Sequence, residues 1–393
     1  MTDDAPVPAV ARRMDAIAPF HVMDVLARAR ALERAGRTIV HMEIGEPDFA
    51  TPAPVIEAGM RALRAGLTHY TSATGLPELR AAIAGFYRSR AGIEVDPARI
   101  VVTPGASGAL QLILGVLLNP GDRVLMADPG YPCNRHFVRM FEGEAAGVPV
   151  DAATGYQLTA ALLEAHWTPD TRAVLLASPS NPTGTLIAPD ELARIAALAE
   201  ARGAALIVDE IYQGLVYEGR AETALHRRGT VFVLNSFSKY FCMTGWRIGW
   251  LVAPERFIPA IDRLAQNIFL ATSTPAQYAA LACFESATLA LLEQRREEFR
   301  ARRDFLLPAL RGLGFDIPLT PQGAFYLYAD CSRHTKDSYA FCLDLLERAG
   351  VAITPGRDFG HHRPERHVRF AYTTGLEQLR LGVERLGEYL GEG

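Results

Sequence analysis

Short apolar runs alternate with amphipathic segments along most of the chain, and this alternation constrains the fold more than any other feature. The runs are rich in Val, Ile and Leu and cover residues 100–102, 123–126, 173–176, 205–208, 231–234 and 248–252. Segments of helical periodicity accompany them, near residues 54–65, 76–91, 106–118, 159–166, 189–202 and 255–270. Nearly continuous apolar strands are typical of a sheet that helices cover on both faces. The pattern predicts an α/β fold with an α/β/α layered domain and a mostly parallel sheet.

The C-terminal part of the chain has a different pattern. A long helical stretch near 288–313 is followed by an alternating run at 324–328, a helix near 337–349, an apolar run at 367–371 and a last helix near 376–390. A further helix is expected at 22–35, ending before Gly36. We therefore expect a large domain over residues 46–285 and a smaller α+β domain formed by residues 286–393 together with the N-terminal segment 1–45.

Composition and charge exclude several classes of protein. The 393 residues carry a formal net charge of −4, which gives no basic surface for nucleic acid. No apolar run approaches the ~20 residues of a membrane span, and the acidic start differs from a signal peptide. Five scattered cysteines form no cluster with metal-ligand spacing and suit a reducing compartment. We expect a cytoplasmic protein that holds no metal and binds neither nucleic acid nor a membrane.

A lysine and an arginine follow the apolar run 231–234 in a distinctive context. Ser236 and Ser238 precede Lys239 directly, and Arg247 comes eight positions later. Hydroxyls and a guanidinium at the end of a buried strand can hold a phosphate, and an adjacent amine can form an imine. The segment thus suits a phosphorylated aldehyde cofactor. A surface lysine and arginine on a loop are the alternative, and the rest of the chain decides between them.

Other strand ends carry residues of matching chemistry. Small residues, Ala106 and Ser107, open a helix after the run 100–102, where backbone amides can approach an anion; helix capping is the alternative. Tyr131 lies on a proline-rich turn, where it presents a ring to a ligand or packs in the core. Asn181 is held in a loop with two prolines. Asp209 ends the run 205–208, so its charge needs either a cofactor cation or a cross-sheet arginine.

In this order and at these spacings, the motifs resemble the class I/II aminotransferases, which are fold type I pyridoxal-phosphate enzymes. The resemblance runs from about residue 12 to about residue 390. The fragments that carry it are Gly45-Glu46-Pro47-Asp48-Phe49, Tyr70 in His69-Tyr70-Thr71, Pro179-Ser180-Asn181-Pro182-Thr183-Gly184, Asp209-Glu210-Ile211-Tyr212, Ser236-Phe237-Ser238-Lys239 and Arg369-Phe370. Each fragment alone is only moderately specific.

The resemblance implies a role for each matching residue and pyridoxal 5'-phosphate as the cofactor. Lys239 would form the imine, with Asp209 and Tyr212 as the other catalytic residues. The implied cofactor contacts are the phosphate with Ala106, Ser107, Ser236, Ser238 and Arg247, the pyridinium nitrogen with Asp209, the phenolic oxygen with Asn181 and Tyr212, and the ring with Tyr131. Tyr70 would reach the phosphate of the partner subunit, which implies a homodimer with shared active sites. Arg369 would hold the substrate α-carboxylate, assisted by Gly45 and Asn181.

These roles predict an aminotransferase that moves the α-amino group of an L-amino acid to a 2-oxo acid, with 2-oxoglutarate as the expected acceptor. Some aspartate-preferring members carry a lysine shortly after the glycine of the phosphate loop. Here the loop reads Gly105-Ala106-Ser107, which favours neutral donors with aliphatic, aromatic or thioether side chains. Arg12, Arg13, Arg135 and Lys336 are unranked candidates for a second substrate cation.

Three alternatives stay open. A β-eliminating C–S lyase of the same fold would use the same cofactor, and an aspartate-preferring aminotransferase would use the same residues. A transcription regulator with an aminotransferase-like domain would need a DNA-binding module before the resemblance, where the sequence has only about 20 residues.

Overall fold

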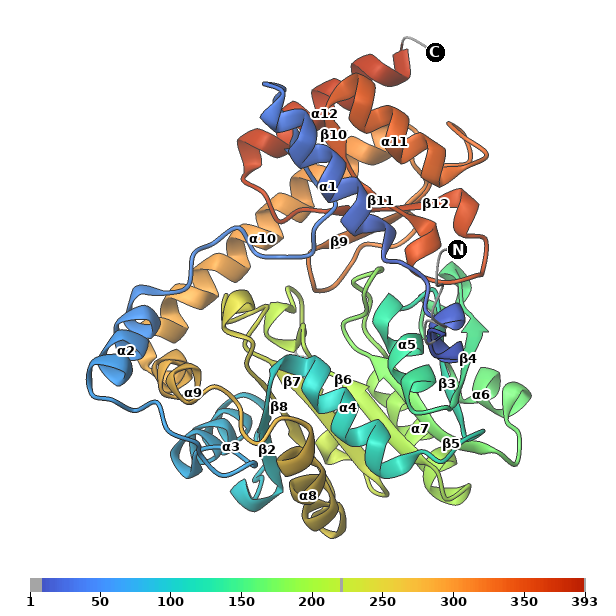
Figure 1. The fold of residues 1–393 in the computed structure, drawn as a ribbon. Helices are drawn as coiled ribbons and strands as arrows, with labels where there is room; N and C mark the ends of the chain where they lie inside the picture. Colours follow the sequence, from blue (N-terminus) through green and yellow to red (C-terminus); the bar gives the residue numbers. More distant parts are fainter. Residues whose placement is uncertain (1–8, 220–221, 392–393) are drawn as a thin grey trace, which may run out of the picture.

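The central sheet determines the architecture. Within residues 9–219 and 222–391, which the computed structural model describes, this sheet has seven strands in the order β2-β8-β7-β6-β5-β3-β4 (Figure 1). Their bounds are β2 Ile100–Thr103, β3 Arg123–Asp128, β4 Glu144–Pro149, β5 Thr171–Ala177, β6 Ala205–Asp209, β7 Val231–Ser236 and β8 Gly249–Val252. β8 pairs antiparallel with β2 and β7, and the other neighbours pair in parallel. The start of β8 therefore lies at the edge where the other strands end.

Helices cover both faces of this sheet, as the apolar runs predict. Ala173 and Leu175 of β5 belong to one buried cluster, and Val174 and Leu176 belong to the other, because successive side chains point to opposite faces. The first cluster includes α4 (Gly105–Leu117), α5 (Pro132–Met140) and α8 (Ile258–Ile268). The second includes α2 (Ala53–Arg64), α3 (Pro77–Ala91), α6 (Ala160–His166), α7 (Pro189–Ala201) and α9 (Thr274–Leu281). The α/β fold with a mostly parallel sheet is thus confirmed.

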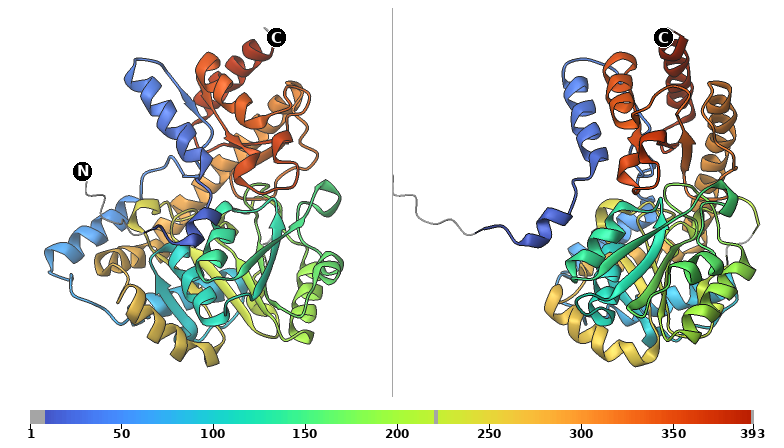
Figure 2. Two further views of the ribbon diagram at one scale, coloured as in Figure 1. Left: turned by 45° about the vertical axis from the view of Figure 1, so that its right-hand side comes forward. Right: turned by 90° about the vertical axis from the view of Figure 1, so that its right-hand side faces the viewer.

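The remaining elements gather beyond the carboxyl edge of the sheet (Figures 1 and 2). β11 (Thr354–Pro355), β12 (His367–Ala371) and β9 (Tyr326–Asp330) form an antiparallel sheet, and β1 (Val40–His41) pairs with β10 (Val351–Ala352) in parallel. The helices there are α1 (His21–Arg34), α10 (Ser286–Gly312), α11 (Ser338–Ala349) and α12 (Leu376–Gly391). The domain boundaries 46–285 and 1–45 with 286–393 stay our proposal, and residues 1–8 and 392–393 of that division lie outside the described residues.

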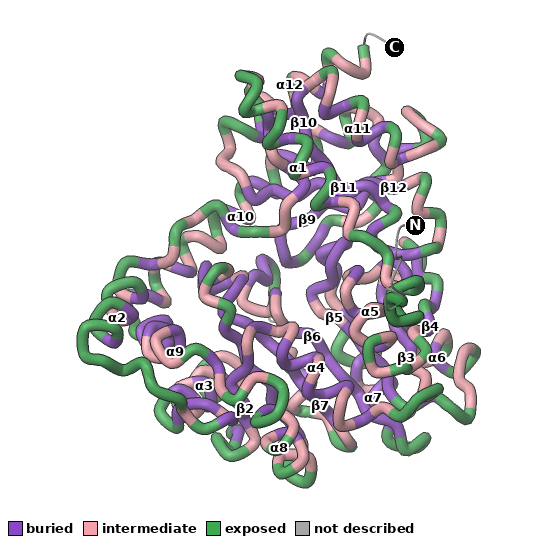
Figure 3. Tube along the Cα trace, in the orientation of Figure 1, coloured by how far each residue is buried: buried purple, intermediate pink, exposed green. Residues whose placement is uncertain are grey.

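The structure contains several helices and strands that the sequence pattern did not predict. The helix α5, Pro132–Met140, is only nine residues long, and β4, Glu144–Pro149, has mostly residues of weak strand preference, namely Glu, Ala, Gly and Pro. α9 has apolar residues on every side and is too short to show a helical period. Figure 3 shows that the central strands are nearly all buried, which is the feature that made them recognisable.

Asp358 joins the N-terminal segment to the rest of the fold. Its two carboxylate oxygens accept hydrogen bonds from the backbone N–H groups of His21 and Val22, each at 2.8 Å. These amides open α1 and have no partner within the helix. Asp128, at the end of β3, accepts from the N–H groups of His361 and His362 at 2.8 and 3.2 Å. The segment 358–362 thus links α1 to the central sheet.

We expect Asp358→Ala to lower the free energy of unfolding by about 1 kcal/mol, because it removes the acceptor that caps α1. Amide hydrogen exchange in residues 20–25 should become faster. Thr159→Ala is the matched control, since Thr159 caps α6 through the Leu162 N–H at 3.1 Å and lies far along the chain from α1. The control should lose similar stability without faster exchange in residues 20–25. Equal rates of amide hydrogen exchange in residues 20–25 of the two variants would contradict the capping role of Asp358.

Candidate active site

A cavity of about 410 Å³ lies at the carboxyl edge of the central sheet, below β9 and β12. Ligands of open α/β sheets bind at this edge, where loops leave the strands. The sequence-predicted residues that line the cavity are Gly45, Ala106, Ser107, Tyr131, Asn181, Asp209, Tyr212, Ser236, Ser238, Lys239, Arg247 and Arg369. Tyr70 is the one predicted site residue that does not line it.

One end of the cavity is built for an anion. α4 opens there with Gly105, whose backbone approaches the Arg247 guanidinium so closely that a Cβ at residue 105 would lie 2.7 Å from Arg247 Nη2. The Ser236 hydroxyl donates to the Ser238 hydroxyl at 2.9 Å. Arg247 precedes the antiparallel strand β8, which brings its side chain to the edge where β7 ends. Helix-terminal amides, two hydroxyls and a guanidinium therefore surround one point.

Lys239 lies in the middle of the cavity. Its ammonium donates to the Gly45 carbonyl oxygen at 2.7 Å. Burial lowers the pKa of Lys239 from 10.5 to about 8, since the neutral amine tolerates loss of water better than the cation does. Glu46 and Asp209 oppose this shift, and Arg369 and Arg247 add to it. The neutral amine of Lys239 is thus far more populated near neutral pH than that of an exposed lysine, although the ammonium form still predominates.

Asp209 ends β6 beside the cavity with 7% of its surface exposed. Burial raises the pKa of Asp209 to about 6, and the Ile211 N–H at 3.0 Å and the charge of Lys239 oppose that rise. Among the residues that the structure describes, no arginine or lysine forms an ion pair with Asp209. The alternative partner of Asp209, an arginine across the sheet, is therefore not found among these residues. A cation supplied by a ligand would stabilise the Asp209 carboxylate.

Arg369 closes the opposite side of the cavity. Its Nη1 donates to Asn181 Oδ1 at 3.1 Å, and its Nη2 donates to the Glu43 carbonyl and to Thr354 Oγ1, the latter at 3.2 Å. Its Nε is buried and has no hydrogen-bond partner among the residues that the structure describes. Buried polar groups of folded proteins are nearly all paired. The guanidinium is therefore held in place with a donor to spare, as binding of a carboxylate requires.

Tyr326 and Glu43 line the cavity as well, and neither is predicted from the sequence. The Tyr326 hydroxyl lies 2.8 Å from the Tyr212 hydroxyl. Glu43 is fully buried, and its carboxylate lies 2.7 Å from His41 Nδ1, which raises the pKa of His41 to about 9. Tyr326 belongs to an apolar alternating run that looks like core packing, so its pattern carried no signal of function. Glu43 stands two residues before Gly45 among apolar residues. A charged residue in such a segment is the one sequence feature that could have indicated a place in the site.

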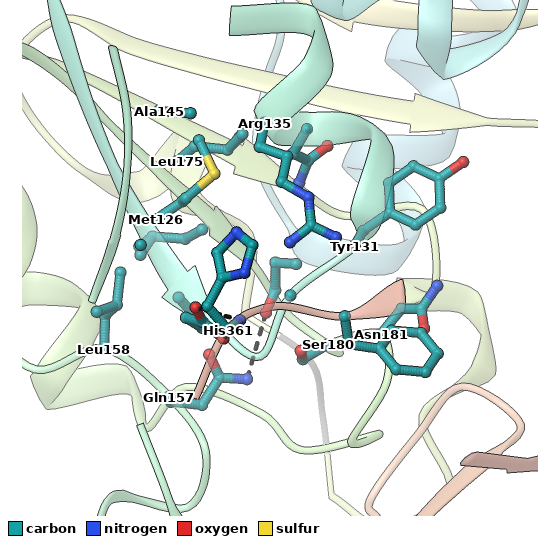
Figure 4. A pocket seen from close by; sticks show the side chains of 18 of the residues that line it. Met126, Tyr131, Arg135, Ala145, Gln157, Leu158, Leu175, Ser180, Asn181 and His361 are labelled. Carbon is teal, nitrogen blue, oxygen red and sulfur yellow. Dashed lines mark hydrogen bonds between the residues drawn. The ribbon is translucent and has the colours of Figure 1, made fainter. Parts of the chain in front are cut away.

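A second, smaller cavity of about 70 Å³ lies next to the first and shares Tyr131 and Asn181 with it (Figure 4). Arg135 points into this smaller cavity, and its guanidinium donates to the Asp358 carbonyl. Tyr70 is 82% exposed in the loop after α2. Within the described ranges no cluster of His, Cys, Asp or Glu has the geometry of a metal site, and no helix is long and apolar enough to cross a membrane.

Comparison with known proteins agrees with this geometry. The family of class I and II aminotransferases matches residues 37–386. The valine–pyruvate aminotransferase of Mycobacterium tuberculosis is 40% identical over 376 residues, which cover 95% of this chain and 97% of that protein. The aspartate/prephenate aminotransferase of Thermus thermophilus is 37% identical, over 97% and 99% of the two chains. A crystal structure of an aminotransferase from Mycobacterium tuberculosis superposes with a TM-score of 0.95 at 40% identity, over 98% and 100%.

The chain therefore belongs to the class I and II aminotransferase family, whose fold is fold type I. It is a pyridoxal-phosphate-dependent aminotransferase, and its substrates are an amino acid and a 2-oxo acid.

Gly45 admits no side chain, because a Cβ at this position would lie 1.9 Å from the Tyr326 hydroxyl oxygen. We expect Gly45→Ala to displace Tyr326 and to lower transamination at least about tenfold, since shifts of an ångström in a site have effects of that size. Gly85→Ala is the control, because a Cβ at residue 85 meets nothing within 4 Å. Wild-type kcat/KM for Gly45→Ala would show that the contact is not tight.

The lowered pKa of Lys239 predicts how the cofactor-free protein captures pyridoxal phosphate. Only the neutral amine attacks an aldehyde, so the capture rate should rise with pH and reach half its maximum near pH 8. Stopped-flow absorbance measures this rate. A midpoint at pH 10 or above would contradict the burial of Lys239.

Proposed function

We propose that this aminotransferase takes its amino group from neutral L-amino acids with aliphatic, aromatic or thioether side chains, in the cavity around Lys239. The observation that carries the proposal is the cavity wall. Phe20, Val22, Met23, Leu110 and Phe137 line it. Apolar walls favour apolar side chains, at about 25 cal/mol for each Å² removed from water.

The charges of the cavity also support a neutral donor. Among the described residues, the cations that line the cavity are Lys239, Arg247 and Arg369, and each has a proposed role elsewhere in the reaction. Of the candidates for a second substrate cation, Arg135 lines the smaller cavity, and Arg12, Arg13 and Lys336 line neither cavity. The described part of this chain therefore places no further cation on the wall of the larger cavity for a distal carboxylate of the substrate.

The charges of the cavity also bear on which 2-oxo acid accepts the amino group. 2-Oxoglutarate is the acceptor that the resemblance predicts, and its distal carboxylate would need a cation of that kind. A monocarboxylic 2-oxo acid such as pyruvate would not, and the Mycobacterium tuberculosis relative is named for valine and pyruvate. The resemblance thus makes 2-oxoglutarate the first candidate, and the charges of the cavity make pyruvate the second.

In this proposal the residues bind and orient two ligands. Pyridoxal phosphate, when bound, supplies a ring that withdraws electrons from the substrate Cα. Asp209 would keep the ring nitrogen protonated, Asn181 and Tyr212 would hydrogen-bond the phenolic oxygen, and Tyr131 would cover the ring. The Ala106 and Ser107 amides, the Ser236 and Ser238 hydroxyls and Arg247 would hold the phosphate. The fit rests on the unpaired carboxylate of Asp209 and on the anion-binding end of the cavity.

The substrate is oriented by Arg369, with the Gly45 backbone and Asn181 beside it. Two parallel hydrogen bonds to the α-carboxylate would fix which bond at Cα stands perpendicular to the ring. Lys239 would accept the proton from Cα as a neutral amine and return it on the cofactor side. Its pKa near 8 suits a group that both takes and gives a proton near neutral pH.

The active form in this proposal is a homodimer with shared sites. Tyr70 is exposed and outside the cavity of its own chain, as expected for a residue that serves the partner. The large apolar side chains Met60, Leu63 and Leu67 are exposed on α2 and the turn that follows it, on the same segment as Tyr70. Such neighbouring apolar residues suit a covered surface.

A panel of donors and acceptors tests the proposal. We expect kcat/KM for methionine, phenylalanine or valine to exceed that for aspartate by at least about tenfold, which corresponds to ~1.4 kcal/mol of transition-state binding. Turnover should require a 2-oxo acid, whereas a C–S lyase would release pyruvate and ammonia from cysteine conjugates without one. Ser107→Lys places an ammonium on the cavity wall and should raise activity toward aspartate relative to methionine. An aspartate preference in the wild-type enzyme would refute the neutral-donor proposal and support the aspartate-preferring alternative.

A further inference from the structure

Tyr326 contacts three residues of the cavity: Tyr212, Arg369 and Gly45. Its ring is buried in β9, and its hydroxyl is 2.8 Å from the Tyr212 hydroxyl. The Arg369 guanidinium lies over the ring, 4.3 Å from its centre. The hydroxyl also fills the space that a Cβ on Gly45 would need. The proposed function gives Tyr326 no role, although it touches the residues assigned to the cofactor and to the substrate carboxylate.

The direction of the hydrogen bond between the two tyrosines decides what Tyr212 can do. Each hydroxyl has one proton to donate. If Tyr212 donates to Tyr326, its proton points away from the cofactor. If Tyr326 donates to Tyr212, the proton of Tyr212 is left to point into the cavity.

Arg369 favours the second direction. A cation over a phenol ring draws electron density toward itself, and this makes the hydroxyl of that ring the stronger donor. Arg369 lies over Tyr326 at 4.3 Å. Tyr212 packs edge-on against Phe325 and Tyr326, with centroids 5.3 and 5.7 Å apart, and the Lys239 ammonium lies over its ring at the longer distance of 6.0 Å. The nearer cation therefore acts on Tyr326.

We propose that Tyr326 is a positioning residue that donates its hydrogen bond to Tyr212 and thereby directs the Tyr212 proton to the phenolic oxygen of the cofactor. The inference rests on the proposed role of Tyr212. It assigns Tyr326 no contact with the reacting atoms. Its effect is transmitted through one hydroxyl, so it should disappear when that hydroxyl is removed.

Spectrophotometric pH titration of the cofactor-loaded enzyme tests this inference without a measurement of activity. When the cofactor is bound, its phenolic oxygen would share a proton with the Lys239 nitrogen. A donor to this oxygen stabilises its negative charge and lowers the pH at which the shared proton is lost. Tyr326→Phe weakens the donor, because hydrogen bonds in a chain strengthen one another. The absorbance midpoint should therefore rise by about half a pH unit.

Two further variants make the result specific. Tyr212→Phe should raise the midpoint more than Tyr326→Phe does, and the double variant should match Tyr212→Phe alone. Tyr328→Phe is the matched control, since Tyr328 is buried in the same strand and does not line the cavity. The control should leave the midpoint unchanged. The thermal stability of each variant shows whether the fold is intact.

Three outcomes would overturn the inference. An unchanged midpoint in Tyr326→Phe, with a raised one in Tyr212→Phe, would reduce Tyr326 to a structural role and leave the proposed function intact. No shift in Tyr212→Phe would refute the role of Tyr212 itself and with it the inference. Additive shifts in the double variant would mean that Tyr326 acts without Tyr212.

Discussion

The carboxylate of Asp209 is buried at the end of a parallel strand and forms no ion pair with a lysine or arginine in the described part of the chain. Its burial raises its pKa to about 6, and the partners that oppose this rise are one backbone N–H and the more distant Lys239. Removing one member of a buried charge pair typically costs about 3–5 kcal/mol. Such a carboxylate in a cavity suits a cationic ligand, and we propose that the protonated ring nitrogen of pyridoxal phosphate would supply the cation.

The reversal of one strand completes the other end of the site. β8 runs against its neighbours, so the chain arrives at the carboxyl edge just before β8 starts. Arg247 stands at this point, in a left-handed conformation with φ of 51°, next to the opening turn of α4. A parallel strand in this place would have delivered Arg247 to the opposite edge. The anion-binding end therefore depends on topology as much as on residue type.

Much of the central sheet, and of the site at its carboxyl edge, could be predicted from the sequence. The strands 100–103, 171–177, 205–209 and 231–236 are apolar enough to be recognised, and the polar residues after them identified one edge of a sheet. The direction of β8 left no trace in its apolar run, because a buried strand looks the same in either direction. Tyr326 looked like core because it is core: its ring packs against Phe325 and Arg369, and only the pairing of two hydroxyls makes it part of the site. α9 was missed because its sequence lacks a helical apolar period, and α5 was missed because it is only nine residues long.

The central claim is that the amine at the centre of the cavity is the one that binds the cofactor covalently. The sequence makes this unusually easy to test, because it contains only two lysines, Lys239 in the cavity and Lys336 in an exposed turn. The decisive measurement is borohydride reduction of the cofactor-loaded enzyme, followed by mass spectrometry of its peptides. We predict one pyridoxyl phosphate group per chain, on the peptide that contains Lys239, and none on a Lys239→Ala variant. Stoichiometric label on Lys336 or on the N-terminal amine, with Lys239 unmodified, would contradict the account.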